Sequence, residues 1–215
     1  NLSRESFYQG SVAGPEEALS LARAMQEQGA EIIDVGAVST APGSPAISQE
    51  RERQRLFPAL SDILDSLDVT VSVDTQRPDI AADALARGAQ CINDVSGLSH
   101  PDMAAAVAEH DASLIIMASR ERAGDLLSLG EIITLLGERM RRAESAGVST
   151  EKIILDPGIG RWIPDKTAAH DLAILDGLHR LRCLGRPLMA ALSRKTFIGE
   201  CLHQPDPFQR LEGSL

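Results

Sequence analysis

The 215-residue sequence has few cysteines and no long run of apolar residues. Its three cysteines form no CxxC pair and no metal-binding spacing, and an odd number is a poor basis for a disulfide framework. No apolar stretch approaches the roughly 20 residues that span a bilayer, and the amino end lacks the apolar core of a signal peptide. We therefore expect a cytoplasmic protein whose cysteines, Cys91, Cys183 and Cys201, stay reduced.

Positive charge is scarce as well. The chain carries 21 Lys and Arg residues against 31 Asp and Glu residues, for a formal net charge of -10, and the charges are spread along its length. Proteins that bind nucleic acid or anionic membranes usually present a basic patch, and none is evident here. We expect small-molecule ligands rather than nucleic acid or a membrane, with any anion held by a local site.

Several familiar catalytic signatures are also missing. The five histidines show no ligand spacing, and the sequence holds no GxSxG elbow, no HExxH pair and no phosphate-binding P-loop. The short GxG at 158–160 is not enough to indicate dinucleotide binding. These absences argue against a catalytic or metal-binding histidine and against a dinucleotide cofactor.

What the sequence has instead is one unit that repeats. Short runs rich in Ile, Val and Leu are continuous rather than alternating, which is typical of strands buried on both faces of a parallel sheet. Stretches with helical spacing separate these runs, several with Pro and acidic residues at the start and Gly just past the end. The predicted strands are 31–37, 69–75, 91–97, 113–119, 152–158 and 187–193, and the predicted helices are 15–28, about 49–66, 77–87, 101–109, 129–146 and 168–184.

Repeated β-α units form either a TIM (β/α)8 barrel or an open, doubly wound sheet. All strand ends open onto one mouth in a barrel, whereas only those at the switch point do so in an open sheet. Nearly every predicted strand ends in a polar or charged side chain, which favours the barrel. Without a linker-like tract, we expect a single domain over residues 1–215. Only about six of eight strands are identifiable, so we expect the first strand and the last strand-helix unit to lie outside this chain.

Five of the strand-end residues define a candidate site: Asp34, Asp74, Asn93, Asp156 and Lys195. Clustered carboxylates repel one another unless they bind a cation, share protons or accept hydrogen bonds from a ligand rich in N–H groups. A guanidine-like heterocycle would meet that need.

Simpler interpretations remain open for some of these residues. Asp156 precedes Pro157 and could serve only to hold a turn. Lys195, next to Arg194, could be a solvated charge at a helix start, although a cation there opposes the helix dipole. We expect Asp94 to brace its own loop rather than to contact a ligand.

Five strings of the sequence occur in an order that is characteristic of one family. They are IIDVGAVSTAPGS, VSVDT, CINDVSG, LDPGIG and ALSRKTFIG, and the opening NLSRESF is similar to that family's first loop. Together they resemble the dihydropteroate synthases, which are pterin-binding (β/α)8 barrels, and the resemblance extends from Asn1 to Leu215. It implies a transferase of folate-type biosynthesis that condenses hydroxymethyl-dihydropterin diphosphate with p-aminobenzoate or a related arylamine and releases diphosphate.

The resemblance also implies roles for individual residues. The pterin would be bound by Asp34, Asp74, Asn93, Met117, Asp156 and Lys195, of which Asp74, Asp156 and Lys195 would act in catalysis. The diphosphate and the second substrate would be held by Thr40, Arg161, Ser193 and Arg194, and Asn1 would contact Mg2+ brought with the diphosphate. A homodimer is a further expectation.

Departures from the family's pattern fall on the second-substrate side. Ala41 stands where the family has a loop arginine, and Ala191 replaces a glycine. Arg161 and Trp162 stand in place of a phenylalanine and a glycine. The candidates to replace the missing arginine are Arg4, Arg120 and Arg161. Two other functions remain open: a pterin-dependent methyltransferase and a pterin-binding paralogue without activity.

Overall fold

The computed structural model describes residues 1–3, 9–39 and 44–215. Its centre is one sheet of five parallel strands, hydrogen-bonded in the order β1-β2-β3-β4-β5. A doubly wound sheet reverses its strand order at a switch point, whereas the strands of a barrel follow one another around the axis. The sequential order is therefore that of the predicted TIM barrel. The strands are β1 (Ile32–Gly36), β2 (Thr70–Asp74), β3 (Cys91–Asp94), β4 (Ser113–Met117) and β5 (Ile153–Asp156).

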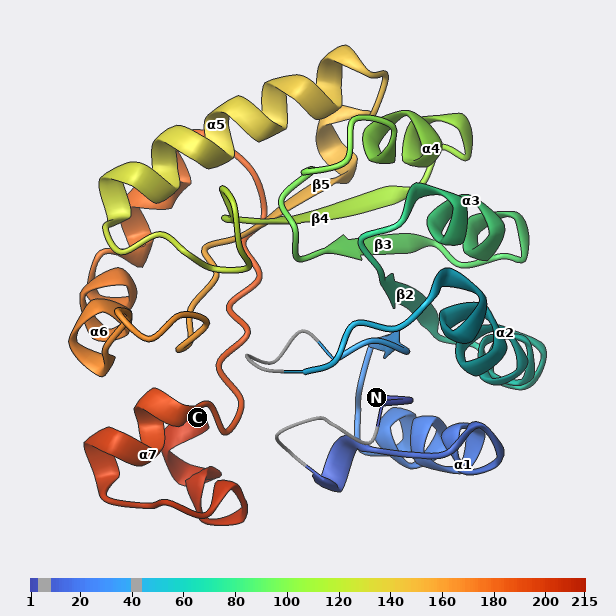
Figure 1. Cartoon of the computed structure of the whole chain (residues 1–215), viewed down its shortest axis with the longest axis horizontal. Helices are drawn as coiled ribbons and strands as arrows, with labels where there is room; N and C mark the ends of the chain where they lie inside the picture. Colours follow the sequence, from blue (N-terminus) through green and yellow to red (C-terminus); the bar gives the residue numbers. More distant parts are fainter. Residues whose placement is uncertain (4–8, 40–43) are drawn as a thin grey trace.

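The first five helices lie along the outer side of this sheet (Figure 1). The helix predicted over 168–184 is interrupted at Gly177, where a Cβ would lie 2.4 Å from Leu129 Cδ2. The α-helices are α1 (Pro15–Glu27), α2 (Gln49–Ser66), α3 (Pro78–Ala86), α4 (Met103–Glu109), α5 (Leu129–Ser145), α6 (Ala168–Asp176) and α7 (Thr196–Leu202). Short 3-10 segments are η1 (Gln9–Ser11), η2 (Thr150–Lys152), η3 (Leu178–Leu184), η4 (Pro207–Arg210) and η5 (Glu212–Ser214).

The sixth predicted strand, 187–193, is reduced to a single bridge. Leu188 pairs with Leu155 of β5 in the parallel direction. The bridge is formed by the Leu155 N–H donating to the Pro187 carbonyl at 3.0 Å and the Met189 N–H donating to the Leu155 carbonyl at 2.9 Å. Pro187 has no N–H to give to a longer ladder. The segment still follows β5 around the sheet, in the order that a barrel requires.

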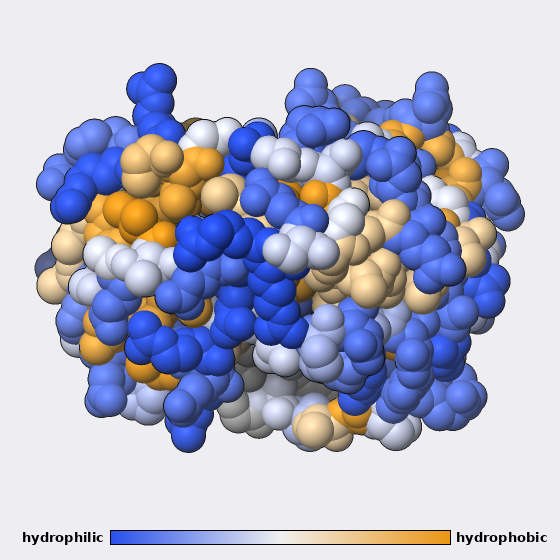
Figure 2. Space-filling view, turned by 90° about the horizontal axis from the view of Figure 1, so that it is seen from above, coloured by the Kyte–Doolittle hydropathy of each residue, from blue (hydrophilic) through white to orange (hydrophobic). Residues whose placement is uncertain are grey.

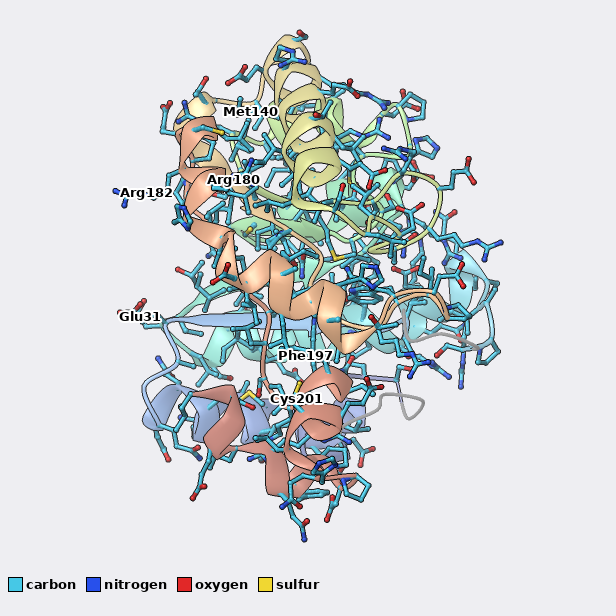
Figure 3. All side chains as sticks on the ribbon, turned by 90° about the vertical axis from the view of Figure 1, so that its left-hand side faces the viewer. Glu31, Met140, Arg180, Arg182, Phe197 and Cys201 are labelled. Carbon is cyan, nitrogen blue, oxygen red and sulfur yellow. The ribbon has the colours of Figure 1, made fainter. Side chains whose placement is uncertain are left out.

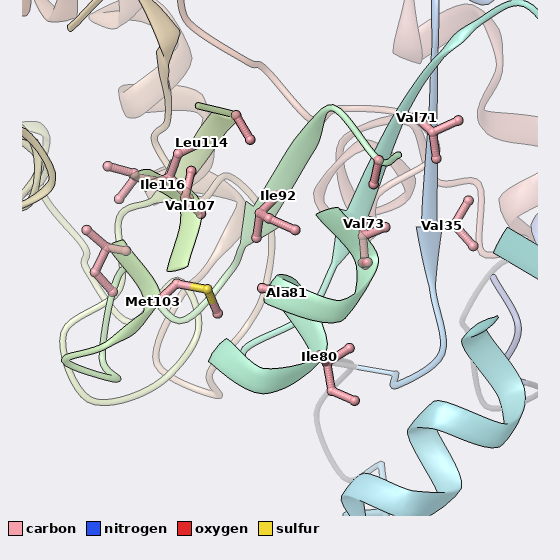
Figure 4. Close-up of a cluster of buried hydrophobic side chains, with 14 of the residues drawn as sticks. Val35, Val71, Val73, Ile80, Ala81, Ile92, Met103, Val107, Leu114 and Ile116 are labelled. Atoms are coloured by element: carbon pink, nitrogen blue, oxygen red, sulfur yellow. The ribbon is translucent and has the colours of Figure 1, made fainter. Parts of the chain in front are cut away.

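The core lies between the strands and the helices that cover them. Buried Val, Ile and Leu side chains of β2, β3 and β4 face α3 and α4 (Figure 4). Burying one such side chain fully contributes roughly 1.5 to 3 kcal/mol, so this layer holds the strands firmly in register and fixes the level at which they end. The cluster includes Val71, Val73, Ile80, Ala81, Ile92, Met103, Val107, Leu114 and Ile116.

The outer surface is mostly hydrophilic. Polar residues dominate the face seen from above, on the side where α4 and α5 lie, and the apolar residues there form separate patches (Figure 2). In the side view, α5 with Met140 and α7 with Phe197 and Cys201 lie at opposite ends of the molecule (Figure 3). Within the described residues, no helix has the length and apolar character needed to cross a bilayer.

Candidate functional site

The strand register brings the predicted site residues to one rim. Asp74 of β2 is level with Asn93 of β3, and Met117 of β4 is level with Asp156 of β5. The carboxyl ends of parallel barrel strands open to the same side, so these side chains surround one mouth. Lys195 reaches the same region from the turn before α7, close enough for its charge to act on Asp156.

Two carboxylates of the mouth have raised pKa values: Asp74 at the rim, and Asp34, which is level with Ser72 and so lies deeper. Burial raises the pKa of Asp34, even though solvent still reaches its side chain, and a hydrogen bond from Asn93 opposes the rise. Burial raises the pKa of Asp74 well above its ordinary range, and the nearby charge of Asp34 raises it further. Two close carboxylates in a poorly solvated recess repel each other unless a proton or a ligand reduces their charge, so this pair is suited to accept hydrogen bonds from ligand N–H groups.

Asn93 carries a buried acceptor that the protein leaves unpaired. Its Nδ2 donates to Asp34 Oδ2 at 3.1 Å, but its Oδ1 has no hydrogen-bond partner among the residues that the structure describes. An unpaired buried polar atom costs about 1 to 3 kcal/mol. A ligand N–H directed at this oxygen would remove that cost, so Asn93 is suited to read a donor on a bound ring.

Asp156 ends β5 and is buried, with 2% of its surface exposed. Its Oδ1 accepts the Gly158 N–H at 2.8 Å, which is the turn-holding contact expected of an Asp-Pro pair. Burial raises the pKa of Asp156, while the positive charge of Lys195 and the Gly158 N–H oppose the rise. In the described part of the chain, no second hydrogen bond reaches this carboxylate. Asp156 can therefore hold the turn and still offer Oδ2 to a ligand.

Lys195 lies against the loop that follows Asp156. Its Nζ donates to the Ile159 carbonyl and lies 5.1 Å from the centroid of the Trp162 ring. Burial lowers the pKa of Lys195, and the charge of Asp156 opposes this effect. The close approach requires Gly160, which has a φ of 124° and where a Cβ would lie 3.0 Å from Lys195 Cδ.

A buried ion pair beneath this loop was not predicted from the sequence. Lys166 and Asp171 both have 0% of their surface exposed, and Lys166 Nζ lies 3.7 Å from Asp171 Oδ1. Lys166 donates to the carbonyls of Gly158 at 2.6 Å and Gly124 at 3.3 Å. Asp171 Oδ1 accepts the Gly160 N–H at 2.8 Å. Charged residues are normally exposed, so the sequence does not indicate this burial.

The residues predicted for the second substrate are more dispersed. Arg161 Nη1 pairs with Glu200 of α7 at 2.8 Å, and about half of the Arg161 side chain is exposed. Ser193, which the sequence assigned to the diphosphate and the second substrate, is exposed. Thr40, Ala41 and Arg4 lie outside the described residues.

Arg194 is directed toward the carboxyl-terminal segment. Its guanidinium donates to the carbonyls of Pro207 at 3.0 Å and Phe208 at 2.8 Å. Its backbone N–H donates to Ser214 Oγ at 2.8 Å, and its carbonyl accepts from Arg210 Nη1 at 3.0 Å. These contacts hold the turn that presents Lys195, and they occupy the group that the sequence assigned to an anionic substrate.

Asn1 lies on the β1 side of the mouth. The Leu2 N–H donates to the Gly36 carbonyl at 2.8 Å, which holds the amino end beside the end of β1. Asn1 and Asp34 line the same recess, so the two residues are neighbours. Residues 1–3, 9–39 and 44–215 contain no group of three His, Cys, Asp or Glu side chains that could hold a metal ion. Mg2+ is usually bound by one or two carboxylates, substrate phosphates and water, so Asn1 could supply one oxygen ligand at most.

Asp94 braces its own loop, and this prediction is confirmed. Its Oδ1 accepts the Ser96 N–H at 2.9 Å and the Ser96 hydroxyl at 2.6 Å, and its Oδ2 accepts the Leu98 N–H at 2.9 Å. Both carboxylate oxygens are thus used within the loop, which holds the segment after β3 next to Asn93.

Comparison with known proteins connects this rim to one family. A family model described as pterin binding enzyme matches residues 1–215. A dihydropteroate synthase of Synechocystis is 40% identical over 206 residues, which cover 92% of this chain and 70% of that protein. Two solved structures of Xanthomonas albilineans dihydropteroate synthase match 100% of this chain and 78% of theirs. The one with 4-aminobenzoic acid has a TM-score of 0.87 and 34% identity, and the one with 7,8-dihydropteroate has 0.85 and 32%.

Proposed function

Because the chain belongs to the pterin-binding enzyme family, and to the dihydropteroate synthases within it, we propose that it condenses hydroxymethyl-dihydropterin diphosphate with p-aminobenzoate. The observation that supports this most directly is the pair of acceptors at the rim, next to the ammonium of Lys195: Asn93 Oδ1, which has no partner among the described residues, and the carboxylate of Asp156, which is 2% exposed. Such a pattern fits a flat ring that carries N–H donors along one edge and acceptors beside them.

The pterin would lie edge-on to Asp156. An aminopyrimidinone edge has adjacent N–H groups that a carboxylate accepts as a pair, and a ring without them would leave Asp156 and Asn93 unpaired and buried. Lys195 would donate to the ring's acceptors. Met117, which is 1% exposed and level with Asp156, would supply an apolar wall.

The reaction breaks the bond between the pterin's methylene carbon and the diphosphate oxygen, and the diphosphate leaves with the electron pair. The arylamine nitrogen bonds to the same carbon and then loses a proton. Positive charge that develops on the methylene carbon is delocalised into the ring. Negative charge on Asp34 and Asp74 near this carbon would stabilise the transition state.

Magnesium belongs to the diphosphate end of this proposal. When bound, Mg2+ would neutralise charge on the departing diphosphate. Asn1 would offer it one amide oxygen, in keeping with its place at the end of β1 beside Asp34. Thr40 and Ser193 would contact the diphosphate. Arg194 would act through the turn it holds, because its guanidinium is bound by Pro207 and Phe208.

The carboxylate of p-aminobenzoate needs a cation, and we assign it to Arg161. The partner of Arg161 is Glu200, and both side chains are more than one third exposed. An exposed ion pair contributes only roughly 0 to 1 kcal/mol, so a substrate carboxylate can replace Glu200 at little cost. This exchange would compensate for the arginine that Ala41 replaces.

The test is diphosphate release from hydroxymethyl-dihydropterin diphosphate in the presence of p-aminobenzoate and Mg2+, with dihydropteroate identified as the product. We expect release that depends on both substrates. Pterin binding by calorimetry without product would instead favour a non-catalytic paralogue. The relatives described above are synthases, which disfavours a methyltransferase, and methyl transfer to a corrinoid protein would be the sign of that activity.

Two further expectations accompany the transferase. We expect a homodimer, since α7 and the following turns carry exposed apolar side chains such as Leu202, Phe208 and Leu211. Light scattering at several protein concentrations would show whether the mass is that of one chain or two. We also expect the protein to act in the cytoplasm, where fractionation would locate it.

A further inference from the structure

The short segment Gly158–Gly160 is bound by side chains at each of its three residues. Under the proposed function, two of these side chains contact the pterin and two do not. The two that contact it are Asp156, which accepts the Gly158 N–H, and Lys195, which donates to the Ile159 carbonyl. The other two, Lys166 and Asp171, are not used by the proposed mechanism.

Lys166 joins two loops of the mouth. Its Nζ donates to the Gly158 carbonyl at 2.6 Å and to the Gly124 carbonyl at 3.3 Å. Gly158 follows β5, whereas Gly124 belongs to the loop after β4. The lysine is 0% exposed, so these carbonyls and Asp171 replace all of its water. It therefore sets the spacing of the two loops that flank Met117.

Asp171 holds the other end of the segment. It lies in α6, is 0% exposed and accepts the Gly160 N–H through Oδ1 at 2.8 Å. Its Oδ2 has no hydrogen-bond partner among the described residues. A buried ion pair with an unpaired oxygen is weak evidence for stability, because apolar side chains of similar size often serve as well. What an apolar pair could not do is bind one N–H and one carbonyl of the same short loop.

We infer that Lys166 and Asp171 are positioning residues: by fixing the backbone of Gly158–Gly160, they place the Asp156 carboxylate and the Lys195 ammonium for the pterin. Asp156 and Lys195 are tied to adjacent peptide groups of this segment, so a shift of the segment moves both. The inference rests on the proposed function, because that function identifies the ligand as a pterin. The contacts of Lys166 and Asp171 with the segment do not depend on turnover.

A second Lys-Asp pair in the same chain provides the matched control. Lys152 Nζ lies 2.7 Å from Asp111 Oδ1, with 30% and 82% of the two side chains exposed. This pair joins the loop after α4 to η2, at the opposite ends of the strands from the mouth. It has the same two side chains and a shorter separation, but it contacts no residue of the site.

The experiment compares Lys166→Met, Asp171→Ala and Asp171→Asn with Lys152→Met and Asp111→Ala in the full chain. We expect the KM for hydroxymethyl-dihydropterin diphosphate to rise about tenfold in K166M and D171A, because each loses hydrogen bonds that involve a charged group. The KM for p-aminobenzoate should rise less, by no more than about threefold, because Arg161 follows Gly160 in the chain but its guanidinium is held separately by Glu200 of α7. D171N should be intermediate, at about threefold, since an amide oxygen can still accept the Gly160 N–H.

The affinity for 7,8-dihydropteroate, measured by calorimetry, should follow the same order without requiring turnover. If the wild-type chain binds 7,8-dihydropteroate but releases no diphosphate, the proposed function fails while the binding series still tests the positioning role. The inference is overturned if the pterin KM and the dihydropteroate affinity remain within about twofold of wild type in every folded variant of Lys166 and Asp171. It is also overturned if the KM values of both substrates rise equally in these variants. Thermal unfolding identifies the folded variants, and D171N, which preserves side-chain size, carries the test if K166M or D171A does not fold.

Discussion

The two sides of the mouth are built differently. On the pterin side, Asn93, Asp156 and Lys195 are tied to neighbouring strands and loops by hydrogen bonds between largely buried groups. On the arylamine side, Arg161 has an exposed and replaceable partner, and Ser193 is open to solvent. Recognition of a rigid ring needs acceptors fixed in advance, because each unpaired buried group is costly. A carboxylate on an arylamine can be bound by a cation that is not fixed in advance. The sequence departs from its family on this arylamine side of the mouth.

The largest effect should come from the buried side. Replacing Asp156 by Ala removes the acceptor of the paired N–H groups and the contact to Gly158, so we expect the affinity for 7,8-dihydropteroate to fall about hundredfold. Calorimetry measures this directly. Asp111→Ala is the control, because Asp111 also interacts with another residue through its carboxylate but lies at the opposite ends of the strands from the mouth. If D156A bound 7,8-dihydropteroate within about threefold of wild type, the buried pterin side would not contribute more to binding than the exposed arylamine side.

A smaller effect concerns Asp74 and pH. Burial holds the folded-state pKa of Asp74 above its unfolded value, so between these two pKa values the folded protein binds more protons than the unfolded chain. The free energy of unfolding of the ligand-free protein should therefore fall as pH rises from about 4 through the folded-state pKa. Asp74→Asn should weaken this dependence and be about 1 kcal/mol more stable than wild type at pH 8, although less active. Urea unfolding at pH 5 and pH 8 tests this, and parallel pH profiles for the two proteins would contradict it.

The smallest effect should come from the exposed side. Arg161→Ala should raise the KM for p-aminobenzoate by about threefold and leave the KM for the dihydropterin substrate unchanged, because an exposed ion pair contributes little. Steady-state kinetics with each substrate varied in turn separates the two values. Glu200→Gln should lower the KM for p-aminobenzoate by releasing Arg161. A rise of both KM values in R161A would mean that the two sides of the mouth are coupled.

Strand-end chemistry could be predicted from the sequence because it depends on local order. An apolar run followed by Asp156, Pro157 and Gly158 indicates a buried strand with a carboxylate at its end whatever surrounds it. The burial of Lys166 could not be predicted in this way, because it depends on Gly124 and Asp171, which meet it only after folding. Charged residues are normally exposed, so a sequence pattern assigns Lys166 to the surface.

Element boundaries failed where partners distant in the chain decide them. The predicted helix over 168–184 breaks at Gly177, where the side chain of Leu129 from α5 occupies the space that a Cβ would need. The predicted strand 187–193 shortens to a bridge at Leu188, because a strand exists only as far as its neighbours pair with it. Helical spacing indicated the first segment and an apolar run indicated the second, but neither the break nor the shortening can be read from these patterns.

The turn that presents Lys195 depends on residues that the ribosome adds after it. Arg194 is held by the carbonyls of Pro207 and Phe208 and by the hydroxyl of Ser214, so the turn cannot take its final form until segment 207–214 has emerged. Domains fold from the amino end during synthesis at about 5 to 20 residues per second. We therefore expect the strands β1 to β5 to be in place before the lysine is, and a nascent chain to acquire affinity for a pterin only after segment 207–214 has emerged.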